Sequence, residues 1–170
     1  MFNFQKKLLF LMPFGVKSSP PMLKKIVGKI WRKMPASLRM KIIRTTQRKF
    51  TISVAAVIVN ENGEVLLLDH VLRPASGWGI PGGFLKHDEQ PVDAVQRELY
   101  EETGIGLTDV ELFQVQTIYR HVEILFRAKT VGKPEVKSRE INAVGWFRAG
   151  EMPENLSLTQ KVLVEKLLTR

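Results

Sequence analysis

The charges of this 170-residue chain are divided unevenly along its length. Residues 1–50 hold 13 Lys or Arg and no Asp or Glu, whereas residues 51–170 hold 13 Lys or Arg and all 17 acidic residues. The two parts therefore carry formal charges of +13 and −4. This division predicts two parts with different roles: a basic arm, residues 1–50, and a mildly acidic body, residues 51–170.

The composition is that of an ordinary globular protein, with 44% hydrophobic and 25% charged residues, and it excludes a wholly disordered or fibrous chain. The sequence has no cysteine, so it cannot form disulfides, thiolate nucleophiles or cysteine-based metal sites. Any bound metal must be held by oxygen or imidazole. The lack of cysteine also favours a reducing compartment.

The longest uncharged apolar run, from Leu8 to Val16, has nine residues and is interrupted by Pro13 and Gly15. A membrane-spanning helix needs about 18 apolar residues, so the sequence predicts no such helix. The interruptions also argue against a secretory signal, although Lys6 and Lys7 precede the run. We expect a cytoplasmic protein, with peripheral membrane association through the arm as an open alternative.

The arm is expected to be helical. Between Met22 and Met34, apolar residues recur at the spacing of a single helical stripe, with basic residues between them: Leu23, Ile26, Val27, Ile30, Trp31 and Met34. Pro35 ends this helix, and residues 36–46 predict a second one. Its inward residues would be Leu38, Ile42 and Ile43, and its outward ones Arg39, Lys41 and Arg44.

Three roles of the arm remain open. An anionic membrane surface suits both the cationic face and the apolar stripe. RNA or DNA suits the charge but leaves the stripe unexplained. Packing on the body, or on a second subunit in a homodimer, explains the stripe and makes the charges a solvated face.

The body has the pattern of a mixed β-sheet covered by helices. Residues 51–59 and 64–70 predict a hairpin around Asn60–Gly63, and Trp78–Ile80 is a short apolar piece stopped by Pro81, Gly82 and Gly83. A helix is expected from Pro91 to Gly104 and a last one from near Ser157. Strands are expected at residues 110–119, 121–129 and 141–147. The fold class is α/β.

Three carboxylates of the first body helix share one flank. Glu98, Glu101 and Glu102 are spaced i, i+3, i+4, beside the apolar stripe that seats the helix on the sheet. Carboxylates so close repel one another, and a hard divalent cation such as Mg²⁺ is their natural partner. Because Mg²⁺ usually shares its ligand shell with substrate phosphates, this pattern indicates phosphate chemistry.

The preceding loop has a different expected role. Glu89 and Arg97 would form an ion pair that ties the loop to the helix and holds Gly83 near the metal, where its carbonyl can be a ligand. Gly82 and Gly83 allow the tight backbone path that this arrangement requires.

At these residues the chain resembles the Nudix hydrolase family of MutT-like proteins. The family's box reads Gly, five residues, Glu, seven residues, then Arg-Glu-aliphatic-x-Glu-Glu-x-Gly-aliphatic, and every defined position is present from Gly83 to Ile105. The resemblance covers residues 51–170 and leaves the arm outside. It implies a Nudix-type α/β/α sandwich with a mixed β-sheet. It also implies hydrolysis of a nucleoside diphosphate linked to another moiety, with Mg²⁺ or Mn²⁺ as the cofactor.

Carried over position by position, the resemblance makes Glu98, Glu101 and Glu102 catalytic metal ligands, with Gly83 as a carbonyl ligand. Glu89 and Arg97 become the structural pair. One position departs from the pattern, because the residue before Glu89 is usually glycine and is Asp88 here. This change either alters the loop or adds a carboxylate, and it removes no ligand.

The resemblance implies that the general base is either a glutamate of the box or an acid from a later loop, for which Glu140 is the candidate. Arg73 and Phe84 are the candidates for substrate contacts, Arg73 through phosphate, although Arg73 also fits a surface loop and Phe84 also fits packing. His70 and His87 are expected to be loop or surface residues. The alternative to an enzyme is a non-catalytic nucleotide-binding or RNA-binding module on the same scaffold.

Overall fold

The computed structural model describes residues 20–73, 77–130 and 132–168 in full, and of residue 131 the backbone alone. The apolar run from Leu8 to Val16 lies outside this range. The chain forms two units, residues 1–49 and residues 50–170, and each is described by itself. Among the described residues, no helix has the length and apolar character required to cross a membrane.

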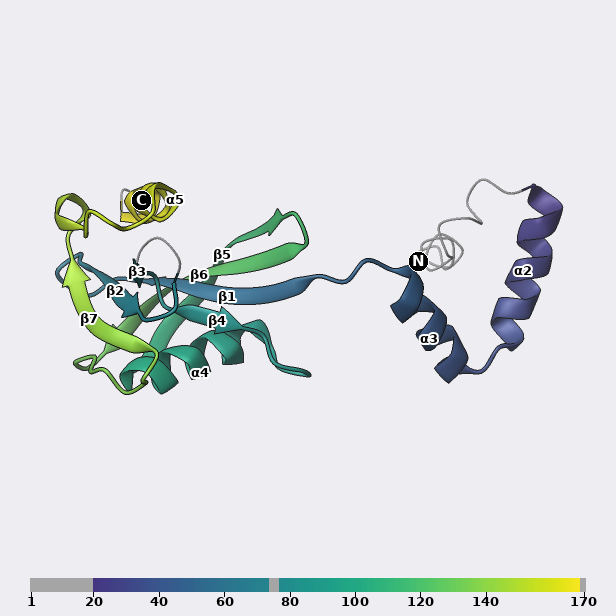
Figure 1. The fold of residues 1–170 in the computed structure, drawn as a ribbon, viewed down its shortest axis with the longest axis horizontal. Helices are drawn as coiled ribbons and strands as arrows, with labels where there is room; N and C mark the ends of the chain where they lie inside the picture. Colours follow the sequence, from purple (N-terminus) through teal and green to yellow (C-terminus); the bar gives the residue numbers. More distant parts are fainter. Residues whose placement is uncertain (1–19, 74–76, 169–170) are drawn as a thin grey trace. The chain divides into compact units, whose positions relative to one another are not determined.

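The first unit contains two helices, α2 (Pro21–Lys33) and α3 (Ala36–Thr46), at the predicted positions (Figure 1). The apolar stripe predicted on α2 is buried only in part. Trp31 is 7% exposed, but Ile26 is 48% exposed and Ile30 is 58% exposed. At about 100° per residue, Trp31 and Ile26 point about 140° apart, so one can be covered while the other meets solvent.

The second helix, α3, also departs from its predicted orientation. Leu38, expected to point inward, is exposed, whereas Arg39, expected to point outward, is half-buried. Ile42 and Ile43 are half-buried as well, and α3 has no fully buried residue. The described helices of the arm therefore leave much apolar surface uncovered.

The second unit is built around two β-sheets (Figure 1). One has the strand order β4-β1-β6-β5, with β1 and β6 parallel and the other pairs antiparallel. The other has the order β3-β2-β7 and is antiparallel. The elements of this unit are β1 (Thr51–Ile58), β2 (Val65–His70), β3 (Trp78–Gly79), β4 (Gly82–Phe84), α4 (Pro91–Thr103), β5 (Gly106–Ile118), β6 (His121–Val131), β7 (Ile141–Phe147), the 3-10 turn η2 (Ala149–Glu151) and α5 (Leu158–Leu168).

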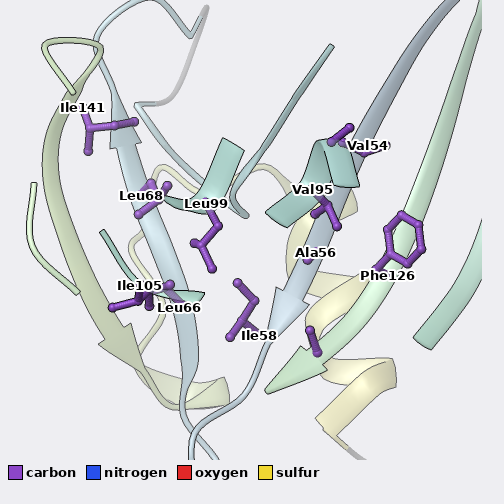
Figure 2. Packing of buried hydrophobic residues seen from close by; sticks show 12 residues of the cluster. Val54, Ala56, Ile58, Leu66, Leu68, Val95, Leu99, Ile105, Phe126 and Ile141 are labelled. Atoms are coloured by element: carbon purple, nitrogen blue, oxygen red, sulfur yellow. The ribbon is translucent and has the colours of Figure 1, made fainter. Parts of the chain in front are cut away.

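Alternate residues of the central strands face the two helices. Val54, Ala56 and Ile58 of β1 belong to a buried cluster with Val95 and Leu99 of α4, which Figure 2 shows. The intervening residues Ala55 and Val57 belong to a second cluster with Val164 and Leu167 of α5. The helices thus cover opposite faces of the strand layer, as expected from the alternation of side chains along a strand. The predicted α/β/α sandwich with a mixed sheet is confirmed.

The predicted hairpin of residues 51–59 and 64–70 is only partly correct. The turn forms, with Gly63 at φ 74° and the Asn60 side chain accepting hydrogen bonds from the backbone N–H groups of Asn62 and Glu64. Beyond an isolated bridge between Val59 and Val65, however, the two strands enter different sheets. One edge of β1 pairs with β4 and the other with β6, while one edge of β2 pairs with β3 and the other with β7. Neither strand therefore has a free edge for pairing with the other.

Two strand boundaries also differ from the prediction. Gly82 and Gly83, expected only to stop a strand, form β4 with Phe84 and pair with Ala55 and Val54 of β1. The strand predicted from Val110 begins at Gly106, because an irregularity around Asp109, at φ 50°, interrupts the alternation. In both places the backbone pairs while the side-chain pattern gives no strand signal.

We predict that Gly82→Ala destabilises the fold by about 1–3 kcal/mol, the usual cost of overpacking. A Cβ at position 82 would lie 2.3 Å from the Val54 carbonyl oxygen and 2.7 Å from the Ala55 Cα, and neither backbone atom can move aside cheaply. Urea unfolding measures the loss. Gly150→Ala is the control, because a Cβ there meets nothing within 4 Å, and an equal loss in both variants would contradict the prediction.

Candidate active site

Helix α4 carries the three glutamates and is fixed at both ends. Pro91 occupies its first turn, and Gly104 ends it in the left-handed conformation at φ 74°. Ala94, Val95 and Leu99 are buried in the core between these ends. Their packing draws Glu102 inward, leaving its side chain 9% exposed, whereas the Glu101 side chain remains half exposed.

The Arg97 guanidinium gathers the acidic groups around it. Its Nε and Nη2 donate to the two carboxylate oxygens of Glu89, at 2.6 and 3.0 Å. Its Nη1 donates to Glu98 at 2.8 Å and to Glu101 at 3.2 Å. The loop before α4 and the helix itself are therefore joined through one side chain.

Glu98 lies directly against the backbone of β4. A Cβ placed on Gly83 would lie 2.3–2.7 Å from the carboxylate atoms of Glu98, so this contact exists only because residue 83 is glycine. The pairing of β4 with β1 holds Gly83 in this position. The structure thus brings together two of the residues named for metal binding, the Gly83 backbone and the Glu98 side chain.

Glu102 lies in the most buried part of the site. Its Oε1 is 3.8 Å from His70 Nδ1, and its Oε2 has no hydrogen-bond partner within the described part of the chain. Burial raises the pKa of Glu102 to about 8, and the negative charge of Glu98 adds to the shift. Without a bound metal ion, this carboxyl group is mostly protonated at neutral pH.

His70 was expected to be a loop or surface residue, and that expectation is wrong. It ends β2 with its side chain 15% exposed. Burial, and then the charge of Arg73, lowers the pKa of His70 to about 4, so the imidazole is neutral beside Glu102. The sequence of β2 could not reveal this, because the contact of His70 with Glu102 joins two residues far apart in the chain. His87 is exposed, as expected.

Arg73 also lies at the site. Its Nη1 is buried, has no hydrogen-bond partner among the residues that the structure describes, and occupies the space that a Cβ of Gly79 would fill. Burial lowers the pKa of Arg73, while the charges of Glu102 and Glu123 oppose that shift. The guanidinium therefore carries an unpaired N–H close to two carboxylates.

Glu140 is exposed in the turn before β7, where its backbone carbonyl accepts a hydrogen bond from the Val71 N–H at 2.9 Å. Its charge contributes to the raised pKa of Glu102, so the two carboxyl groups are near neighbours. The structure thus brings the later acidic residue to the same end of the molecule as the box.

A cavity of about 170 Å³ adjoins Gly83. Arg73 and Phe84, the two candidates for substrate contact, line it. Phe84 is largely exposed and its ring also packs edge-on against His121, with centroids 6.0 Å apart. The sequence analysis missed three polar residues that line the cavity: Ser53, Glu123 and Gln160. No sequence signal singled them out, since each is one polar residue within a strand or helix.

The three glutamates do not converge on one point in this conformation. Within the described ranges, no group of three Asp, Glu or His side chains has the geometry to hold a metal ion. Arg97 holds Glu98 and Glu101, while Glu102 faces His70. The donor set is nevertheless suited to a hard cation, because it consists of oxygen atoms and includes a buried carboxylate oxygen without a partner.

The backbone conformation of Asp88 explains why aspartate can stand before Glu89 where glycine is usual. Asp88 has φ 59°, in the left-handed region that glycine adopts without strain and that Asp tolerates better than most residues. Its carboxylate is exposed and lies 2.8 Å from His87 Nδ1. The backbone path of a glycine is therefore kept, and the added carboxylate contacts His87 in solvent.

Comparison with known proteins agrees with this geometry. The model of the NUDIX domain matches residues 49–167. A MutT-like protein of Streptomyces ambofaciens is 37% identical over 113 residues, which cover 63% of this chain and 70% of the relative. An 8-oxo-dGDP phosphatase of Danio rerio is 31% identical over 116 residues, but this chain spans only 36% of its length.

Among solved structures, a MutT NUDIX hydrolase of Burkholderia pseudomallei aligns with a TM-score of 0.63 and 29% identity, covering 71% of this chain and 99% of that one. The chain belongs to the Nudix hydrolase family, whose members act on pyrophosphate bonds.

The Glu89–Arg97 pair predicts a pH-dependent contribution to stability. Hydrogen bonds from Arg97, and then from the Lys86 N–H, lower the pKa of Glu89 to about 2 from its usual 4.5. The pair therefore stabilises the fold above pH 4.5, and this contribution is lost as the pH falls toward 2. The melting temperature of the wild type should exceed that of Glu89→Gln most near neutral pH. A difference that grew in acid would contradict this assignment.

Asp88 provides a second test. We predict that Asp88→Val lowers the free energy of unfolding by about 1–2 kcal/mol, because a β-branched residue fits the left-handed region poorly, whereas Asp88→Gly changes it by less than about 1 kcal/mol. His87→Val is the matched control, since it also removes the contact between residues 87 and 88 but has an ordinary φ. Equal losses in His87→Val and Asp88→Val would show that the contact matters and the backbone does not.

Proposed function

We propose that the protein is a Mg²⁺-dependent pyrophosphohydrolase that cleaves a nucleoside diphosphate linked to another moiety, with Mn²⁺ as an alternative cofactor. The carrying observation is that Gly83 lies against the Glu98 carboxylate and also lines a cavity with Arg73, whose Nη1 has no hydrogen-bond partner among the described residues. This combination offers oxygen ligands for a cation and a donor for phosphate at one place.

Glu98, Glu101, Glu102 and the Gly83 carbonyl would hold the cation. When bound, the cation neutralises diphosphate charge and lowers the pKa of a coordinated water. The raised pKa of Glu102 supports this assignment, because a buried carboxyl group with three carboxylate neighbours gains most from an added positive charge.

The other residues would bind and orient the substrate or move its protons. Arg73 would donate its unpaired Nη1–H to a phosphate oxygen, and Phe84 would contact the substrate where its ring lines the cavity. Either a box glutamate or Glu140 would accept the proton of the attacking water. The Glu89–Arg97 pair would keep the loop and the helix in register during these steps.

Turnover of a substrate panel tests the proposal directly. When Mg²⁺ is present, the purified full chain should hydrolyse at least one of ADP-ribose, NADH, dinucleoside polyphosphates, nucleotide sugars or nucleoside triphosphates. Hydrolysis should stop when EDTA is added. The relative named as an 8-oxo-dGDP phosphatase adds oxidised nucleoside diphosphates to the panel. Nucleotide binding without turnover of any compound would instead favour a binding module on a Nudix scaffold.

The carboxylates can be tested one at a time. We predict that Glu98→Gln, Glu101→Gln and Glu102→Gln each lower kcat by about a hundredfold or more, because an amide supplies neither the charge nor the basicity of a carboxylate. Mn²⁺ affinity, followed by electron paramagnetic resonance, should fall in parallel. Asp93→Asn on the exposed side of α4 is the control and should keep both properties. Near wild-type turnover in Glu102→Gln would contradict the assignment.

A further inference from the structure

The described part of the arm is unusually basic. Residues 20–49 contain ten Lys or Arg and no Asp or Glu. These residues belong to a unit separate from the Nudix body, and the NUDIX domain model begins only at residue 49. The hydrolase site therefore does not account for this charge, and the arm requires an explanation of its own.

Helix α2 carries two parallel rows of exposed side chains. One row is apolar and consists of Met22, Ile26 and Ile30, which are 75%, 48% and 58% exposed. The other consists of Lys25, Lys29 and Lys33, all exposed. Both rows have the spacing i, i+4, i+8, and at about 100° per residue they run about 60° apart around the helix.

The apolar row is not the packing face of the helix. The buried residues of α2 are Gly28 and Trp31, and their side of the helix lies well over 90° from Ile26. Leu23, next to the apolar row, is also exposed. An apolar row bordered by lysines is thus left uncovered on a helix that already uses another side for packing.

The chemistry of the two rows selects one kind of partner. A nucleic acid would neutralise the lysines but leave the apolar row in water. A second copy of the chain joined through the apolar row would bring its own lysine row alongside the first, and residues 20–49 contain no acidic side chain to offset the repulsion. An anionic lipid surface satisfies both rows, with the apolar side chains at the boundary of the acyl chains and the ammonium groups at the phosphates.

We propose that α2 docks the protein reversibly on anionic membranes, with Met22, Ile26 and Ile30 inserted and Lys25, Lys29 and Lys33 at the lipid headgroups. The helix lies in the interface plane. This inference does not depend on the proposed hydrolysis, since it concerns a separate unit and a separate ligand.

Vesicle flotation of the full chain tests the proposal. The protein should float with vesicles that contain phosphatidylserine at low salt, should float much less at high salt, and should stay in solution with vesicles of phosphatidylcholine alone. If the full chain stays in solution with phosphatidylserine vesicles at low salt, the proposal is wrong.

Two pairs of variants separate the contributions of the rows. The triple variant Lys25→Gln, Lys29→Gln, Lys33→Gln should weaken binding by on the order of a hundredfold, since each lysine near an anionic surface contributes about fivefold. Its control, Arg44→Gln, Arg48→Gln, Lys49→Gln, removes the same charge from elsewhere in the arm and should weaken binding less. An equal loss in both would show that net charge alone binds the protein, and would overturn the assignment to α2.

The apolar row is tested in the same way. Ile26→Ser with Ile30→Ser should weaken binding by about tenfold or more, because both side chains lose their insertion. Leu158→Ser with Val162→Ser is the matched control, since these residues have the same spacing on α5 and are also exposed. If the full chain binds RNA but not vesicles, and RNA binding is lost in the lysine variant and kept in the Ile variant, the partner is a nucleic acid. A concentration-dependent dimer lost in the Ile variant would identify a second copy.

Discussion

The site depends on the bidentate pair between Arg97 and Glu89. The pair joins the loop that precedes α4 to the helix, and the same guanidinium donates to Glu98 and Glu101 and offsets their negative charges. The pair is screened from solvent, with both side chains less than one-fifth exposed, so its hydrogen bonds are stronger than those of a surface pair. The closeness of β4 to Glu98 follows from the same anchoring, since Arg97 also donates to the Phe84 carbonyl at 3.3 Å.

Packing and charge oppose each other along α4. The apolar residues Val95 and Leu99 fix how the helix rolls on the sheet, and this roll buries Glu102, which alone would be destabilising for an ionised carboxylate. The raised pKa of Glu102 is the direct consequence. The fold tolerates this cost at a place where His70 and Arg73 also lie, and such a group of titratable residues with shifted pKa values is the pattern expected of a functional site.

The sequence allowed most of this fold to be predicted, because its signals are local. Periodicity located α4, the strand predicted at residues 121–129, which extends to Val131, and the strand at residues 141–147. The spacing of the box named the pair and the glutamates before their geometry was known. It could not predict that β1 and β2 separate into two sheets, since that depends on competition for strand edges among distant segments. Nor could it place His70 beside Glu102 or Gln160 at the cavity, because such contacts join residues far apart in the chain.

The way Arg97 divides its donors bears on how a cation would enter. Glu89 takes Nε and Nη2, whereas Glu98 and Glu101 share only Nη1. If Glu98 and Glu101 turned toward a cation, Arg97 would lose the two hydrogen bonds of its Nη1 but keep the two hydrogen bonds to Glu89. The guanidinium would therefore stay in place. The loop and Gly83 would then remain positioned while the glutamates rearrange. A lysine at position 97 could not do this, because an ammonium group lacks the planar set of donors that lets Arg97 keep a bidentate pair with Glu89 while Glu98 and Glu101 move away.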